Sequence, residues 1–238
     1  MDISQQIQTS HDFNQSNFFK NQMTTLLKLA LFCIAYLFPC YALATYSFEA
    51  ATGGAYNFPM PLNIYQKGYP NINMTAHYDT KPFSPPPYYL LRIGKWNDNK
   101  AWELEFIHHK LYLSNTTDEV NNFTITNGYN LITLNRAWLN TRNYIWRVGA
   151  GIVLAHPESK IRDQTFSETG GIFNDDGYFV AGPSLMASLG KRFYLSKSFF
   201  IELEGKVTAS YADVKIANGN AEAPDVAIHA NVGIGYDL

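Results

Sequence analysis

The most regular pattern in the chain lies at its C-terminal end, where apolar residues alternate with small or polar ones from Val226 to Leu238. Side chains on a strand alternate between its two faces, so this run predicts a strand with one apolar face. That face consists of Val226, Ile228, Ala230, Val232, Ile234, Tyr236 and Leu238. In a soluble sandwich it would be the core face, whereas in a membrane barrel it would face lipid.

Alternating segments of the same kind recur from Ile72 onward. With the last strand they predict about eight strands, namely 72–83, 88–96, the segment between Asn99 and Ser114, 123–138, 144–154, 179–192, 201–211 and 226–238. Residues 123–138 alternate least regularly, and Gly128 predicts a bulge or bend there.

The connections between these segments alternate in length. Tight turns follow the second, fourth and sixth segments, whereas the other connections are longer or richer in Pro and Gly, as at Ser84–Pro87 and 157–176. Short turns at one end and longer loops at the other are typical of outer-membrane barrels with both termini in the periplasm. The sequence therefore predicts an all-β protein, an eight-stranded antiparallel transmembrane β-barrel spanning residues 72–238.

The residues before Ile72 are expected to lie outside the barrel. An apolar run from Leu26 to Tyr41 follows Lys20 and ends at Ala42-Leu43-Ala44, which predicts a signal peptide cleaved after Ala44. Met1 and Met23 both remain possible starts. Residues 45–71 are rich in Gly, Pro and Tyr and are interpreted as a periplasmic lead-in.

Composition narrows the class of protein further. Charged residues make up 16% of the chain, aromatic residues 15%, and the mean hydropathy is -0.18. That hydropathy is too polar for a bundle of membrane helices, and the net charge of -2 argues against a nucleic-acid partner. Both cysteines, Cys33 and Cys40, lie in the predicted signal peptide, so the mature chain would hold no thiol and no disulfide.

The terminal strand also carries a resemblance to a known class. With Tyr236 third from the end and alternating apolar residues before it, it resembles the last strand of bacterial outer-membrane proteins, although it ends on Leu238 where Phe is usual. The chain thus resembles the small eight-stranded barrels of Gram-negative bacteria, such as the OmpA transmembrane domain, OmpX and OmpW. The resemblance implies an outer-membrane location, with the barrel-assembly machinery, outer-membrane lipids and lipopolysaccharide as partners.

The polar face of the predicted strands collects ionisable residues. Turns centred between Asp98 and Asn99 and on Lys197 place Arg92 opposite Glu105, Arg192 opposite Glu202 and Ser188 opposite Lys206. Paired opposite charges stabilise a sheet, and an eight-stranded barrel is just wide enough for its own side chains to fill it. The predicted luminal network comprises Arg92, Glu103, Glu105, Arg147, Arg192, Glu202, Glu204, Lys206 and His229, with His77 and Asp79 on the same face.

Three functional interpretations follow from this face. The first is a structural or surface-interaction barrel with a filled lumen, and the second is a narrow gated channel. The third is a lipid A-modifying acyl hydrolase or transferase, with Ser184, Ser188 or Ser210 as nucleophile and His229 as base. The His and Ser pattern of barrel deacylases, with one residue between them, is absent, so this interpretation relies on fold analogy.

The His108-His109-Lys110 run is the most conspicuous polar cluster. Adjacent residues on a strand point to opposite faces, so both imidazoles cannot bind one metal ion from regular β structure. We therefore expect no metal site and no cofactor. His109 is predicted to be luminal, whereas His108 and Lys110 would face the outer headgroup zone, where they could contact lipopolysaccharide phosphates. Near the tight turns, Trp96, Trp102, Trp138, Tyr144, Trp146 and Phe199 predict an aromatic girdle.

Overall fold

The computed structural model describes residues 45–167 and 178–238, so the predicted signal peptide lies outside the described residues. Eight long strands form a closed antiparallel barrel. They are β1 (Thr45–Asn57), β5 (Tyr89–Asn97), β6 (Lys100–Leu113), β7 (Val120–Leu139), β8 (Tyr144–Ala155), β11 (Phe179–Tyr194), β12 (Phe199–Ser210) and β15 (Asp225–Asp237). Within the described ranges, no helix is long and apolar enough to cross a membrane.

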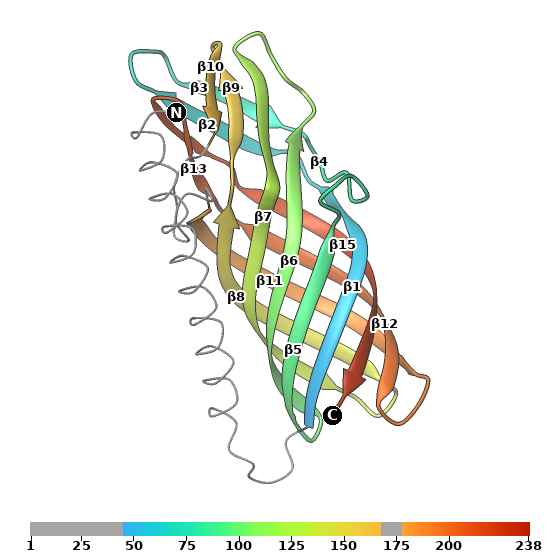
Figure 1. The fold of residues 1–238 in the computed structure, drawn as a ribbon. Coiled ribbons are helices and arrows are strands. Elements are labelled where there is room, and N and C mark those ends of the chain that lie inside the picture. Colours follow the sequence, from blue (N-terminus) through green and yellow to red (C-terminus); the bar gives the residue numbers. More distant parts are fainter. Residues whose placement is uncertain (1–44, 168–177) are drawn as a thin grey trace, which may run out of the picture. The chain divides into compact units, whose positions relative to one another are not determined.

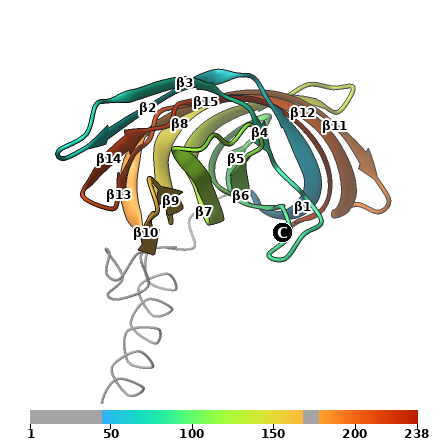
Figure 2. The ribbon, with the colours of Figure 1, turned by 90° about the horizontal axis from the view of Figure 1, so that it is seen from above.

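The barrel closes through neighbouring antiparallel pairs. β1 pairs with β5 on one side and with the last strand, β15, on the other, and the β6–β7 pairing completes the ring. The strands are tilted along the barrel (Figure 1) and curve around its axis when seen from above (Figure 2). The predicted class, an eight-stranded antiparallel barrel, is confirmed by this topology.

The first strand of the barrel is not the predicted one. Residues 45–57, interpreted as part of a periplasmic lead-in, form β1, whereas residues 72–79 form only the short strands β3 (Ile72–Ala76) and β4 (Tyr78–Asp79) outside the ring. β1 lacks bulky alternation because residues 50–55 are all small, and at Gly53 a Cβ would lie 2.1 Å from the carbonyl oxygen of Ala230. As a consequence, the predicted luminal residues His77 and Asp79 are exposed outside the barrel.

The two ends of the barrel differ. The tight turns β5–β6, β7–β8 and β11–β12 lie at the end that also holds Thr45 and Leu238, which we call the turn end. At the opposite, loop end, β13 (Asp213–Ile216), β14 (Gly219–Glu222), β2 (Met60–Gln66) and β3 form a second sheet, seen to one side of the ring in Figure 2. A hairpin of β9 (Glu158–Ile161) and β10 (Gln164–Ser167) extends the barrel sheet beside β7.

The outer wall of the barrel is apolar and aromatic. The alternation predicted for the C-terminal strand is confirmed, since Ile228, Val232, Ile234 and Tyr236 are all exposed on it. Phe48 and Tyr56 on β1 are eight residues apart, about 26 Å along a strand and about 20 Å along the axis at a tilt of ~40°. This stretch of β1 alone covers most of the apolar band of about 25 Å that outer-membrane barrels present to lipid.

The predicted aromatic girdle forms at the turn end with one exception. Trp102, Trp138, Tyr144 and Trp146 are exposed on the outer wall there. Trp96 instead points into the barrel, where its indole Nε1–H donates a hydrogen bond of 2.8 Å to Ser47 Oγ. Trp96 lies on the same face of β5 as Arg92 and Gly94, and that face lines the lumen.

The interior changes character along the barrel axis. On β6 the inward residues are Glu103 and Glu105 near the turn end but Leu111 and Leu113 near the loop end. On β7, Phe123 and Ile125 belong to this apolar interior, and the predicted bulge is confirmed at the register shift where Gly128 has φ 139°. The loop end therefore folds around its own apolar core, continuous with the barrel wall.

Candidate functional site in the barrel interior

Two predicted registers bring opposite charges together across the lumen wall. Arg92 lies opposite Glu105 and Arg192 opposite Glu202, as the turn positions predict. Arg92 Nη2 is 2.6 Å from a carboxylate oxygen of Glu105, and Arg192 Nε donates to Glu202 Oε2 at 2.9 Å. All four side chains are buried, so each pair is sealed inside the barrel.

Arg92 also contacts its other neighbouring strand and a strand across the lumen. Its Nη1 lies 2.7 Å from Glu49 on β1, and its Nη2 lies 2.7 Å from Glu204 on β12. One guanidinium therefore spans the lumen from β5 to β12. The five donors of a guanidinium allow this geometry, which an ammonium group could not reproduce.

Arg147 on β8 is the second centre of the network. Its guanidinium contacts Glu103 at 2.7 Å, Glu202 at 2.5 Å and Glu204 at 2.9 Å. Lys206 adds an ion pair with Glu105 and another with Glu204 at 3.2 Å. The acidic and basic side chains of the predicted network other than His229 thus form one connected layer that ties β1, β5, β6, β8, β11 and β12 together.

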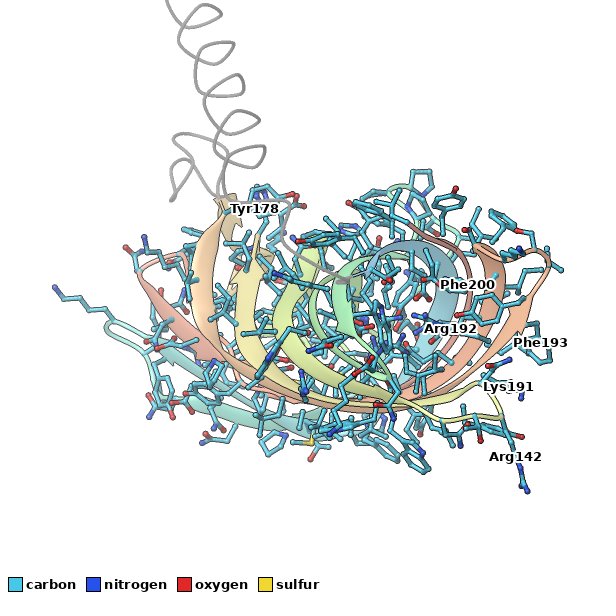
Figure 3. All side chains as sticks on the ribbon, turned by 90° about the horizontal axis from the view of Figure 1, so that it is seen from below. Arg142, Tyr178, Lys191, Arg192, Phe193 and Phe200 are labelled. Carbon is cyan, nitrogen blue, oxygen red and sulfur yellow. The ribbon has the colours of Figure 1, made fainter. Side chains whose placement is uncertain are left out.

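The lumen has room for these long side chains because small residues stand beside them. A Cβ on Gly190 would lie 2.5 Å from Glu202 Oε1, and one on Gly235 would lie 2.2 Å from the Phe200 ring. Arg192 stacks on the same Phe200 ring, with its guanidinium carbon 4.1 Å from the ring centroid. Figure 3 shows Arg192 and Phe200 inside the barrel, whereas Lys191 and Phe193 lie on its outside.

The serine and histidine arrangement predicted for an enzyme is not assembled. Both ring nitrogens of His229 are occupied by other partners: Nδ1 is 3.0 Å from Tyr88 Oη, and Nε2 is 2.9 Å from Thr208 Oγ1. Ser188 donates instead to Glu204, and Ser210 donates to Tyr129. Ser184 Oγ is buried without a hydrogen-bond partner, so none of the three candidate serines is hydrogen-bonded to His229.

A second polar layer lies above the charged one, toward the loop end. His109 is luminal, as predicted, with Nε2 3.0 Å from Asn57 Oδ1 and 3.4 Å from Asp225 Oδ2. Its ring also lies edge-on to His229 with centroids 5.2 Å apart. In the described part of the chain, no group of three or more His, Cys, Asp or Glu side chains is placed to share a metal ion.

The predicted exposure of His108 and Lys110 is wrong. Both belong to the outward face of β6, but both side chains are buried. His108 Nδ1 pairs with Asn130 Oδ1 at 2.8 Å, and its ring stacks on Tyr89 with centroids 5.2 Å apart. Lys110 Nζ donates to the carbonyl oxygens of Lys81 at 3.0 Å and Ser84 at 2.7 Å. A segment between β4 and β5 covers this cation, a contact that alternation along β6 alone cannot reveal.

Sequence reasoning missed several luminal residues. Glu49 and Asn57 were overlooked because β1 was interpreted as a lead-in, and Asp225 because it was placed in a loop. The alternation of Phe48, Ala50 and Thr52 with Glu49 was the available signal for β1. A closed antiparallel barrel also requires its last strand to pair with its first, and here that partner precedes Ile72.

Comparisons with known proteins give matches among solved structures only. Neither protein-family models nor curated protein sequences give a match. Among solved structures, Neisserial surface protein A matches at 7% identity and a TM-score of 0.41, covering 83% of this chain and all of that protein. Ail of Yersinia pestis matches at 12% identity and a TM-score of 0.38, with the same coverage. The N-terminal β-barrel domain of Pseudomonas aeruginosa OprF matches at 15% identity and a TM-score of 0.36, covering 82% of this chain and all of that domain.

The functional class is defined by the topology and the distribution of side chains in this structure. The apolar outer wall, the closed ladder of eight strands and the ion-paired lumen together define a transmembrane β-barrel. In such a barrel no strand edge is exposed to lipid, because each strand pairs on both sides.

Proposed function

We propose that this protein is an outer-membrane barrel that contacts a partner at the cell surface through its loop end, with the barrel as a sealed support. In this proposal both termini lie in the periplasm, because short turns mark the periplasmic end of such barrels. The barrel-assembly machinery inserts the chain, and outer-membrane lipids and lipopolysaccharide surround it.

The sealed lumen supports a binding role rather than transport. Arg92 and Arg147 cross the interior between opposite walls, each ion-paired to several carboxylates. Opening a pore along the axis would require these buried pairs to separate, and each unpaired buried charge is costly. We therefore favour a lumen that stabilises the barrel over one that conducts.

The observation that carries the proposal is Phe83, whose side chain is 83% exposed on the segment between β4 and β5. This segment is held on both sides of Phe83, because buried Lys110 donates to the carbonyl oxygens of Lys81 and Ser84. The backbone N–H of Ser84 also donates to the Lys81 carbonyl at 3.1 Å. An exposed aromatic side chain on a constrained loop is the kind of anchor that dominates protein interfaces.

The experiment places a photo-crosslinking amino acid at position 83 in the full-length protein on intact Gram-negative cells. We expect a crosslinked protein partner at position 83, and none from the same amino acid at Leu195, which is 63% exposed at the turn end. Lys110→Met should reduce the crosslink by releasing the loop. Crosslinking of position 83 to lipopolysaccharide alone would contradict a protein partner and indicate that Phe83 inserts into lipid. Crosslinking to a protein only at position 195 would contradict the proposed orientation and place the turn end at the cell surface.

Conductance tests the sealed lumen separately. The purified protein in planar bilayers is expected to show no steady ion conductance. Stable unitary currents from the wild-type protein would contradict the proposal and favour the channel interpretation.

A further inference from the structure

A continuous apolar groove runs along the outer wall over β1. It consists of two adjoining depressions of about 410 Å³ and 420 Å³, which share Ala50 and Ile234. Its walls and floor come from three further strands: Leu91 and Ile93 on β5, Val232 and Tyr236 on β15, and Phe199 and Ile201 on β12.

The groove arises from a local change in side-chain size. Ala50 lies between Leu91 on one neighbouring strand and Ile234 on the other, so a methyl group is flanked by two long side chains. Toward the loop end the depression continues into small outward residues, since Gly54 pairs with Ala230 and Ala230 pairs with Gly205. Farther around the barrel the same row holds large side chains, Phe106 on β6 beside Ile132 on β7.

The groove offers its occupant little polar chemistry. Its hydroxyl-bearing residues are Thr52, whose hydroxyl already donates to the carbonyl oxygen of Tyr88 at 3.1 Å, and Tyr236. The groove also lies within the apolar wall between Phe48 and Tyr56, which faces the hydrocarbon layer. A hydrocarbon chain matches this lining because it has no hydrogen bond to lose there.

Cations gather where the groove reaches the turn end. Tyr46, Lys95, Trp102 and Arg136 form one row of paired positions across β1, β5, β6 and β7. Lys95 Nζ lies 5.9 Å from the Tyr46 ring centroid, and the Arg136 guanidinium lies 5.2 Å from a Trp102 ring centroid. A row of cationic and aromatic side chains at this level is complementary to lipid phosphates.

We propose that the outer wall over β1 is a binding site for one anionic glycerophospholipid of the leaflet at the turn end. One acyl chain lies in the groove from Phe48 to Val232, and the phosphate lies at Lys95. A second copy of the chain fits this surface less well, because a two-fold contact along β1 would bring Lys95 close to its own copy. The inference rests on the membrane-spanning barrel and is independent of the loop-end contact.

The experiment uses the full-length protein in detergent, with phosphatidylglycerol or phosphatidylcholine added at equal molar ratio, and native mass spectrometry to count retained lipids. We expect one phosphatidylglycerol retained per protein, several-fold more often than phosphatidylcholine. Ala50→Phe, which fills the groove, should lower retention at least fivefold. The matched control Ala150→Phe, at an exposed outward position of β8, should leave retention unchanged.

The headgroup assignment has its own variant and control. Lys95→Gln should remove the preference for phosphatidylglycerol while the groove still retains some lipid of either kind, whereas Lys191→Gln, farther around the girdle, should preserve the preference. Folding of each variant is checked by its shift in gel mobility on boiling. Equal losses from Ala50→Phe and Ala150→Phe would overturn the proposal. So would equal wild-type retention of both lipids, or a wild-type dimer that Ala50→Phe converts to a monomer.

Discussion

The charged lumen and the apolar core at the loop end have the same inward parity, although the apolar core also draws on the second sheet. Along β12 and β13 the inward residues are polar from Glu202 to Ser210 and then apolar at Ala212, Val214 and Ile216. The outward residues change from apolar, as at Leu203 and Val207, to charged, as at Asp213 and Lys215. The same alternate positions face inward on both sides of this boundary. What changes is the surroundings of the outer wall, from lipid to water.

This difference shows how one β-wall meets two solvents. In the membrane zone the apolar residues face outward, so the narrow interior receives the polar ones, and these must satisfy one another. Beyond the membrane zone the outer surface can be wet, so the interior becomes an ordinary apolar core. The His and Tyr layer around His109 and His229 lies where one regime gives way to the other.

The largest expected effect comes from removing the centre of the charged interior. Arg147→Ala removes the nearest ion-pair partner of Glu103 and Glu202 and one partner of Glu204, and we expect it to destabilise the barrel by about 3–5 kcal/mol. Urea unfolding of the protein in lipid vesicles measures this loss. Arg142→Ala, at an exposed residue of the β7–β8 turn, is the control and should change stability by less than about 0.5 kcal/mol. A neutral Arg147→Ala would mean that water, not carboxylate pairing, satisfies the lumen.

A comparable core substitution at the loop end should act locally. Phe123→Ala creates a cavity beside Ile125 and should cost about 3 kcal/mol of loop-end stability. The strand pairings between the Gly128 bulge and the turn end remain intact in this variant. Hydrogen exchange should therefore accelerate in β9, β10 and the first part of β7 but not in β12 or β15. Uniform acceleration over the whole barrel would show that the two interiors unfold as one unit.

The outer wall should distinguish the two zones by their tolerance of charge. Leu134→Lys puts a cation on the lipid-facing side of β7 and should cost about 2 kcal/mol, because that position lies in the hydrocarbon layer. Asn121→Lys, on the exposed loop-end part of the same strand, should be neutral within about 0.5 kcal/mol. Urea titration of both variants measures the difference, and equal costs would place the membrane boundary elsewhere.

The smallest expected effect is a pH dependence confined to the loop end. Hydrogen bonds from Asn63, Tyr211 and Tyr65 hold the pKa of the Glu222 carboxyl below its usual value. A pKa lower in the folded than in the unfolded protein stabilises folding above the unfolded value of about 4.3. This contribution is lost as the pH falls through the lower, folded value.

Hydrogen exchange of the β2 and β14 amides between pH 6 and pH 3 tests this dependence, after correction for the intrinsic exchange rate. We expect protection to fall only in the acidic part of that range, and the extra loss to disappear in Glu222→Gln. The charged lumen offers the contrast, because its carboxylates are sealed from water in the barrel. An unchanged acid response in Glu222→Gln would assign the effect to another group.

The period-two alternation was sufficient to predict the class of fold, the lipid-facing side of most strands and two cross-strand ion pairs. These features depend on local geometry: side chains alternate on a strand, and a tight turn sets the register of the two strands it joins. The pairs Arg92–Glu105 and Arg192–Glu202 are therefore readable from the turns at Asp98 and Lys197. Recognition of strands failed where small residues replaced large ones, as in β1.

Only the tertiary structure decided which distant charges share the lumen and which exposed-looking residues are covered. The contacts of Arg92 with Glu49 and Glu204, and of Arg147 with Glu103 and Glu202, depend on how the wall closes and how far each strand is staggered. Lys110 is covered by the carbonyl oxygens of Lys81 and Ser84, which approach it from another segment of the chain. Alternation along one strand determines the face on which a side chain lies, but closure of the barrel and folding of the connections determine what that face meets.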